Sequence, residues 1–96
     1  MRVRKHPSKT DVMEEAFACI FGYLSGKQAD PIKVVRCAYH YIRLALLRAG
    51  ISYEDDEVKN FIYARSSLMF SRYGELKTLC AVHALKAGML PDLEEE

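Results

Sequence analysis

Apolar residues recur every three or four positions along most of this 96-residue chain. This is the spacing of residues on one face of an α-helix, and no segment shows the alternation that is typical of a half-buried strand. Capping residues, glycines and prolines divide the helical pattern into segments. We therefore expect four helices, at about residues 11–25, 31–49, 53–73 and 75–87.

The ends of these helices carry recognisable signals. Asp30 followed by Pro31 predicts that Asp30 is the N-cap of a helix. Pro31 is then its first residue, a position at which no amide donor is needed. Gly50 supplies a left-handed exit from the same helix, and Ser52 is expected to cap the next one. Gly74 separates the third helix from the fourth. Because a single glycine costs a helix only about 1 kcal/mol, these two helices can also form one kinked rod.

Short connections make consecutive helices antiparallel neighbours. A chain of 96 residues can bury one modest core. The sequence therefore predicts an all-α, compact four-helix bundle-like domain at 10–90. A basic flexible arm at 1–9 is expected before the domain, and an acidic flexible tail at 91–96 after it.

The apolar stripes also predict which side of each helix faces the core. On the first helix the stripe includes Met13, Phe17 and Leu24. On the third helix, Arg65 lies within the stripe and needs a carboxylate partner or a route to water. The fourth helix is expected to bury Leu76, Leu79, Cys80, His83 and Ala87.

The second helix is apolar on two opposite sides, and the third carries a second aromatic line. Four short helices cannot bury all of these faces, and large exposed apolar patches usually mark partner surfaces. We therefore expect a homodimer with two-fold symmetry; the alternative is a monomer in which the second helix is central. The residues expected at the interface are Tyr41, Leu44, Leu47, Tyr63 and Phe70.

Two similar tetrapeptides, Cys-Ala-Tyr-His and Cys-Ala-Val-His, raise the question of a metal. Their pairs, Cys37 with His40 and Cys80 with His83, each lie on one side of a helix. Together they form a chemically sound zinc set, provided that the fourth helix packs on the second apolar face of the second helix. We expect helix packing instead and no cofactor, because all four lie within helices and cysteine often serves as a small core residue.

Catalysis is not expected. The two Cys–His pairs lie on apolar faces, where burial raises the pKa of a thiol and makes it inert. The chain contains neither a glycine-rich phosphate loop nor a Gly-x-Ser-x-Gly sequence.

The net charge of +1 gives no overall attraction to nucleic acid, but basic residues gather locally. A helix-turn-helix is disfavoured because four acids at 54–57 open the helix that would read the bases. Binding to phosphates without base recognition, including double-stranded RNA, is the alternative function. Its residues would be Arg2, Arg4, Lys5, Lys9, Lys33, Arg36 and Arg43.

Three widely spaced cysteines do not form a disulfide framework. No apolar run reaches the roughly 18 residues of a membrane span, so we expect no membrane partner. We expect a cytoplasmic or nuclear protein with reduced thiols. The sequence favours a small non-catalytic protein–protein interaction or regulatory module that self-associates through apolar helix faces.

Overall fold

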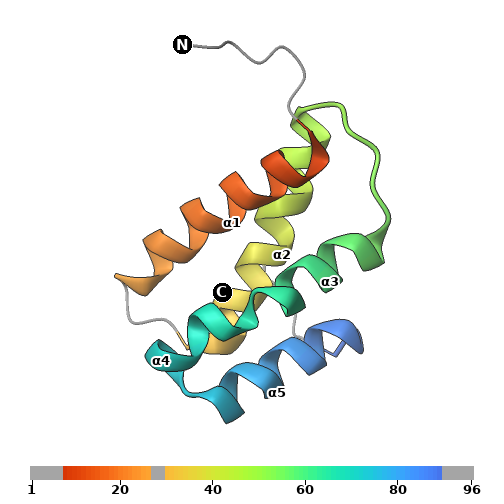
Figure 1. Cartoon of the computed structure of the whole chain (residues 1–96). Coiled ribbons are helices and arrows are strands. Elements are labelled where there is room, and N and C mark those ends of the chain that lie inside the picture. The colour runs from red at the N-terminus through yellow and green to blue at the C-terminus, as the bar shows by residue number, and fades with distance from the viewer. Residues whose placement is uncertain (1–7, 27–29, 90–96) are drawn as a thin grey trace.

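The computed structural model describes residues 8–26 and 30–89, and within these ranges it is all-α, without strands. Its elements are α1 (Lys9–Ser25), α2 (Pro31–Arg48), α3 (Asp55–Ala64), the 3-10 helix η1 (Ser66–Met69), α4 (Phe70–Tyr73) and α5 (Glu75–Lys86). In Figure 1, α3, η1 and α4 follow one another as a bent rod. With this rod counted as one helix, the chain forms the predicted four-helix, bundle-like domain.

The starts of α1 and α2 follow from side-chain caps. The hydroxyl of Ser8 accepts a hydrogen bond from the amide of Asp11 at 3.1 Å, so α1 begins two residues earlier than predicted. The carboxylate of Asp30 accepts one from the amide of Lys33 at 2.9 Å, which confirms the predicted cap of α2. In both helices the cap satisfies an amide that has no partner within the helix.

The predicted cap of the third helix was wrong. The helix begins after Glu54, not Ser52, and the carboxylate of Glu57 accepts a hydrogen bond from the amide of Glu54 at 2.7 Å. The preceding residues form a non-helical connection in which Ile51 and Tyr53 both pack against the core. An extended chain points residues two apart to the same side, and a helix starting at Ser52 would lose this packing.

The third helix does not run unbroken to Tyr73 as predicted. It ends at Ala64, and the chain continues through the 3-10 turn η1. The buried Ser66 donates its hydroxyl hydrogen bond to the carbonyl of Tyr63 at 2.8 Å. Such local bonds compete with regular helix geometry. The change of phase turns Leu68 outward, so that 57% of this residue is exposed.

Gly74 separates α4 from α5, as the sequence predicted. Its φ of 94° and ψ of 139° lie in a region that is open only to glycine at low cost. The third and fourth predicted helices are therefore two elements and not one rod.

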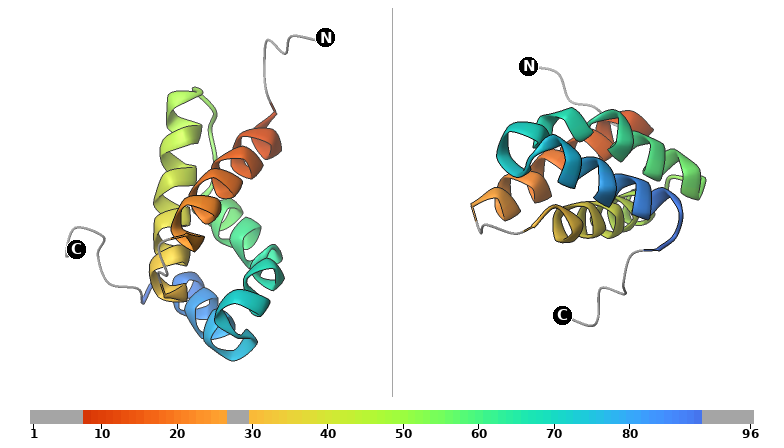
Figure 2. Two further views of the ribbon diagram at one scale, coloured as in Figure 1. Left: turned by 90° about the vertical axis from the view of Figure 1, so that its left-hand side faces the viewer. Right: turned by 90° about the horizontal axis from the view of Figure 1, so that it is seen from below.

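Figures 1 and 2 show the helices in two hairpins. α1 and α2 run antiparallel, and α5 returns along the rod formed by α3 and α4. α1 packs mainly on α2, and α5 packs on α2, α3 and α4. The two hairpins meet over one side of α2.

The core lies where these hairpins meet and confirms the predicted stripe of α1. Its main side chains are Met13, Phe17, Leu24, Val34, Val35, Ala38, Ile42, Leu46, Val58, Phe61, Ile62, Met69, Val82 and Leu85. Arg65 is half-buried at its edge, where its guanidinium pairs with Glu14 and lies 3.7 Å from the centre of the Phe61 ring. The carboxylate partner expected for Arg65 is thus present.

The predicted core face of the last helix was wrong. α5 buries Thr78, Ala81, Val82 and Leu85, whereas Leu76, Cys80 and His83 are exposed. α5 carries apolar residues on more than one side, so its periodicity alone did not select the buried face. The direction in which the chain leaves Gly74 determines which side of α5 faces the core.

Replacing Gly74 should test the separation of α4 from α5. We expect Gly74→Ala to lower the free energy of unfolding by about 1–2 kcal/mol, because alanine is strained at this positive φ. The matched control is Gly22→Ala within α1, where an added methyl group would meet nothing within 4 Å. This control should stabilise by about 0.5–1 kcal/mol. Urea unfolding followed by circular dichroism measures the stability of both variants. Equal changes in the two would contradict the role assigned to the positive φ of Gly74.

Candidate functional site

The four residues of the alternative zinc site are not brought together within one chain. Cys37 and His40 are half-buried on α2, whereas Cys80 and His83 are exposed on α5. In residues 8–26 and 30–89, no group of three or more His, Cys, Asp or Glu side chains is placed to hold a metal ion. The physical reason is that α5 buries the side of Val82 and Leu85, which is opposite to the side that carries Cys80 and His83.

His83 instead contacts an aromatic side chain of α3. Its ring centre lies 5.8 Å from that of Tyr63, and the Nζ of Lys86 lies 4.7 Å from the same ring. Tyr63 was expected at the interface together with Tyr41, but it lies beside α5, whereas Tyr41 lies beside α1. Phe70 is half-buried. The structure therefore does not gather all five expected interface residues around one place.

Three of the five do share the outer side of α2. Tyr41 is 39% exposed, Leu44 43% and Leu47 63%. The opposite side of α2 carries Val35 and Ile42, which are fully buried. α2 is therefore apolar on two sides, as its sequence predicted, and the outer side remains in contact with solvent.

A groove with a volume of about 460 Å³ runs between α1 and α2, and Tyr41 and Leu44 of this outer face line it. Small side chains line it, including Ala16 and Cys19 from α1 and Ala45 from α2. Two charged residues also line it, one from each helix: Glu15 from α1 and Arg48 from α2. Because small residues hold little volume between two helices, the surface is hollowed there.

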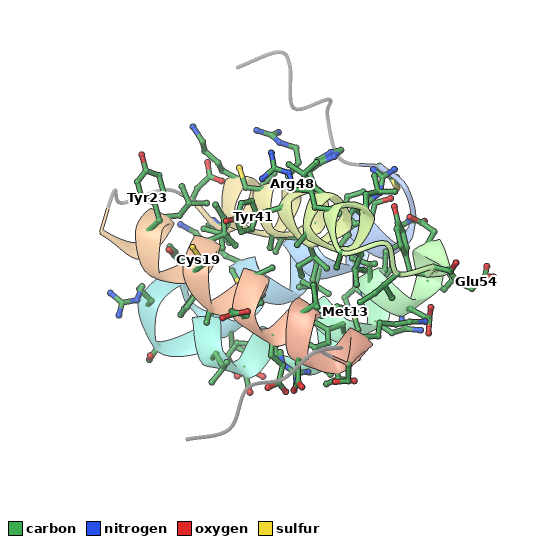
Figure 3. All side chains as sticks on the ribbon, turned by 90° about the horizontal axis from the view of Figure 1, so that it is seen from above. Met13, Cys19, Tyr23, Tyr41, Arg48 and Glu54 are labelled. Atoms are coloured by element: carbon green, nitrogen blue, oxygen red, sulfur yellow. The ribbon has the colours of Figure 1, made fainter. Side chains whose placement is uncertain are left out.

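One contact crosses the groove. The Sγ of Cys19 lies 3.8 Å from the hydroxyl oxygen of Tyr41, and Figure 3 shows these two side chains on neighbouring turns of α1 and α2. Hydrogen bonding to Cys19 is the main cause that raises the pKa of Tyr41, so the phenol is neutral near pH 7. The charge at the groove comes from Glu15 and Arg48.

The sequence did not single out Glu15 or Cys19. A signal was nevertheless present, because Val12, Glu15 and Cys19 recur at helical spacing on a second side of α1. Only the packing of α1 beside α2 shows that this side borders a groove.

The basic residues of the nucleic-acid hypothesis have other contacts. Lys9 pairs with Glu57 at 2.9 Å, and Arg36 is buried. The Nε of Arg43 donates a hydrogen bond to the hydroxyl of Tyr53 at 3.2 Å. Lys33 is half-buried.

The arm residues Arg2, Arg4 and Lys5 lie outside the described residues. Binding to phosphates therefore stays a prediction that depends mainly on this arm. Lys9, which was assigned to the arm, belongs to α1.

A polar cluster joins the middle of α2 to the start of α3. The hydroxyl of Tyr39 donates a hydrogen bond to the carboxylate of Asp55, which also pairs with Lys59 at 3.0 Å. Arg43 lies 5.1 Å from the centre of the Tyr39 ring. Burial, and then the bond to Asp55, raise the pKa of Tyr39 to about 12. Every charge in the cluster has a partner, which favours a structural role.

Comparison of the chain with protein-family models, curated proteins and solved structures finds no match. In the described ranges, no helix has both the length and the apolar character required to cross a membrane. The function of the protein is therefore inferred from the geometry of the α1–α2 surface.

The cluster around Tyr39 predicts a specific dependence of stability on pH. The bond from Tyr39 is the first cause that lowers the pKa of Asp55 below its ordinary value of 3.8. Its stabilisation is therefore present above about pH 4 and is lost as the pH falls through the lowered pKa. We expect Asp55→Asn to lower the free energy of unfolding by about 1 kcal/mol at pH 7 and by less at pH 2.

Asp56→Asn is the matched control, because Asp56 lies in the same exposed first turn of α3. It removes an equal charge near the helix N-terminus and leaves the bond between Tyr39 and Asp55 in place. Urea titrations between pH 7 and pH 2 give both values. An equal loss for both variants at pH 7 would show that the helix dipole, and not the bond to Tyr39, is responsible.

Proposed function

We propose that this protein is a small, non-catalytic protein–protein interaction module that self-associates through the outer face of α2 and the adjoining groove. One observation carries the proposal: Tyr41, Leu44 and Leu47 are exposed on one side of a single helix. Contiguous apolar surface of this kind usually marks an interaction site.

The shape of the groove supports a protein side chain as its occupant. Its volume of about 460 Å³ lies within the range of small-molecule pockets, but the groove is open and continuous with the outer face of α2. A small ligand in the groove would contact Leu44 but would leave Leu47 exposed. A second protein surface covers the groove and both leucines together.

The side chains at the groove also support a non-catalytic role. The thiol of Cys19 contacts the hydroxyl of Tyr41, which is neutral near pH 7. A nucleophilic cysteine is usually paired with a histidine, and none of the described residues that line the groove is a histidine. The contact between Cys19 and Tyr41 is of the kind that joins two helices.

The proposed location is the cytoplasm or the nucleus. Cys19, Cys37 and Cys80 are all free thiols, and Cys19 and Cys80 are exposed. Exposed free thiols are typical of reducing compartments.

Self-association can be tested with one leucine on this face. Leu44→Ser should raise the dimer dissociation constant about thirtyfold. Burying the exposed part of Leu44 contributes about 1 kcal/mol to the free energy of association. A symmetric dimer contains two copies of Leu44, so the loss is about 2 kcal/mol. Sedimentation equilibrium over a range of micromolar concentrations measures the constant.

The control for this experiment is Leu76→Ser. Leu76 is 76% exposed, but it lies on α5, away from the α1–α2 groove. The control should leave the dissociation constant unchanged. A wild-type protein that sediments as a monomer at several hundred micromolar would refute self-association.

A further inference from the structure

The charges beside the groove carry information about its occupant. Glu15 and Arg48 line the groove from opposite helices, and both are exposed. Neither takes part in the ion pairs of the described residues. The groove therefore has an acid on its α1 side and a base on its α2 side.

The antiparallel helices place these two charges within about one helical turn of one another along the groove. The contact between Cys19 and Tyr41 gives a common reference point. Glu15 lies four residues from it along α1, about 6 Å, and Arg48 lies seven residues from it along α2, about 10 Å, in the same direction. Their levels differ by about one helical turn, which the long side chain of arginine can span.

A second copy of the chain matches this distribution of charge. A two-fold axis that lies in the interface and runs parallel to α2 exchanges the two sides of the groove and keeps each residue at its level. Each Arg48 then faces Glu15 of the other copy, and the contact occurs twice, as two-fold symmetry requires. An axis across the groove would place α1 on α1 and α2 on α2, and acid and base would not face one another.

The same two-fold rotation also brings complementary apolar surfaces of the two copies together. Leu44 is exposed and lines the α2 side of the groove, which small residues such as Ala16 and Ala45 leave open. When the axis passes over the middle of the groove, Leu44 of each copy lies over the α1 side of the other copy's groove, at about the level of the small Ala16. A projecting side chain inserted between residues of a facing helix is a common way for helices to pack.

We propose that the occupant of the α1–α2 groove is a second copy of this chain, related by a two-fold axis parallel to α2. Leu44 of each copy packs against the α1 side of the other copy's groove, and Glu15 pairs with Arg48 across the interface. The inference rests on the proposed function, self-association, and adds to it the axis and the charge pairs. A different protein with an amphipathic helix is the competing occupant.

Charge reversal distinguishes this arrangement from other dimers. Glu15→Arg alone places two arginines opposite one another at both contacts, and Arg48→Glu alone places two glutamates there. Each variant should show a dissociation constant at least tenfold above that of the wild type. When the two variants are mixed, both contacts become Arg–Glu pairs, so a heterodimer with near wild-type affinity should form.

Native mass spectrometry of the full-length chains measures the result, because the two homodimers and the heterodimer differ in mass. Arg72→Glu is the matched control: it reverses an exposed arginine on α4, away from the groove, and should leave the homodimer intact. Formation of the heterodimer also shows that both variants fold. The effects should weaken at 1 M salt, where exposed charges are screened.

The outcomes separate the two proposals. Variants that dimerise like the wild type, while Leu44→Ser does not, would overturn the charge pairing and leave self-association standing. A mixture that stays monomeric, with both variants folded by circular dichroism, would also overturn the pairing. A wild-type chain that is monomeric at every concentration would overturn self-association itself and favour a different protein as the occupant.

Discussion

The burial of one side of α2 is the constraint on which the rest of the structure depends. Val34, Val35, Ala38, Ile42 and Leu46 have no exposed surface. α2 packs against α1 on one flank and against α3 and α5 on the other. Removing a large side chain from such a position costs several kcal/mol, because the surroundings relax only in part. Both hairpins therefore depend on the same face of one helix.

Polar contacts orient the hairpins on that face. Lys9 pairs with Glu57 and Glu14 with Arg65, and both pairs join α1 to the third helical segment. The amide of Glu54, and then Lys9, lower the pKa of Glu57, so this carboxylate is charged near pH 7. Exposed pairs stabilise weakly one by one. Here the two ion pairs favour one angle between the hairpins. The apolar contacts between the hairpins are less directional than these pairs.

The same constraint produces the surface that we propose for self-association. α2 can bury only one of its two apolar sides against its own chain, so Leu44 and Leu47 remain outside. α1 covers the edge of that outer side but meets it with small residues, and a groove results. Core packing and the interaction surface are thus two consequences of one two-sided helix.

The sequence by itself determined the helices and several of their ends. Asp30, Gly50 and Gly74 act through their own backbone or side chain, and their effect does not depend on distant residues. The two apolar sides of α2 could also be predicted, because periodicity places residues around a helix axis without reference to any neighbour.

Tertiary structure alone decided which apolar side is buried when a helix has more than one. For α5 the prediction selected the side of Cys80 and His83, and the fold buries the side of Val82 and Leu85. The break at Ser66 and the start of the third helix at Glu54 likewise depend on packing against distant residues. The groove and its facing charges exist only once α1 lies beside α2. The local sequence pattern determines which sides of a helix are apolar, and the packing of the neighbouring helices determines which of these sides is buried.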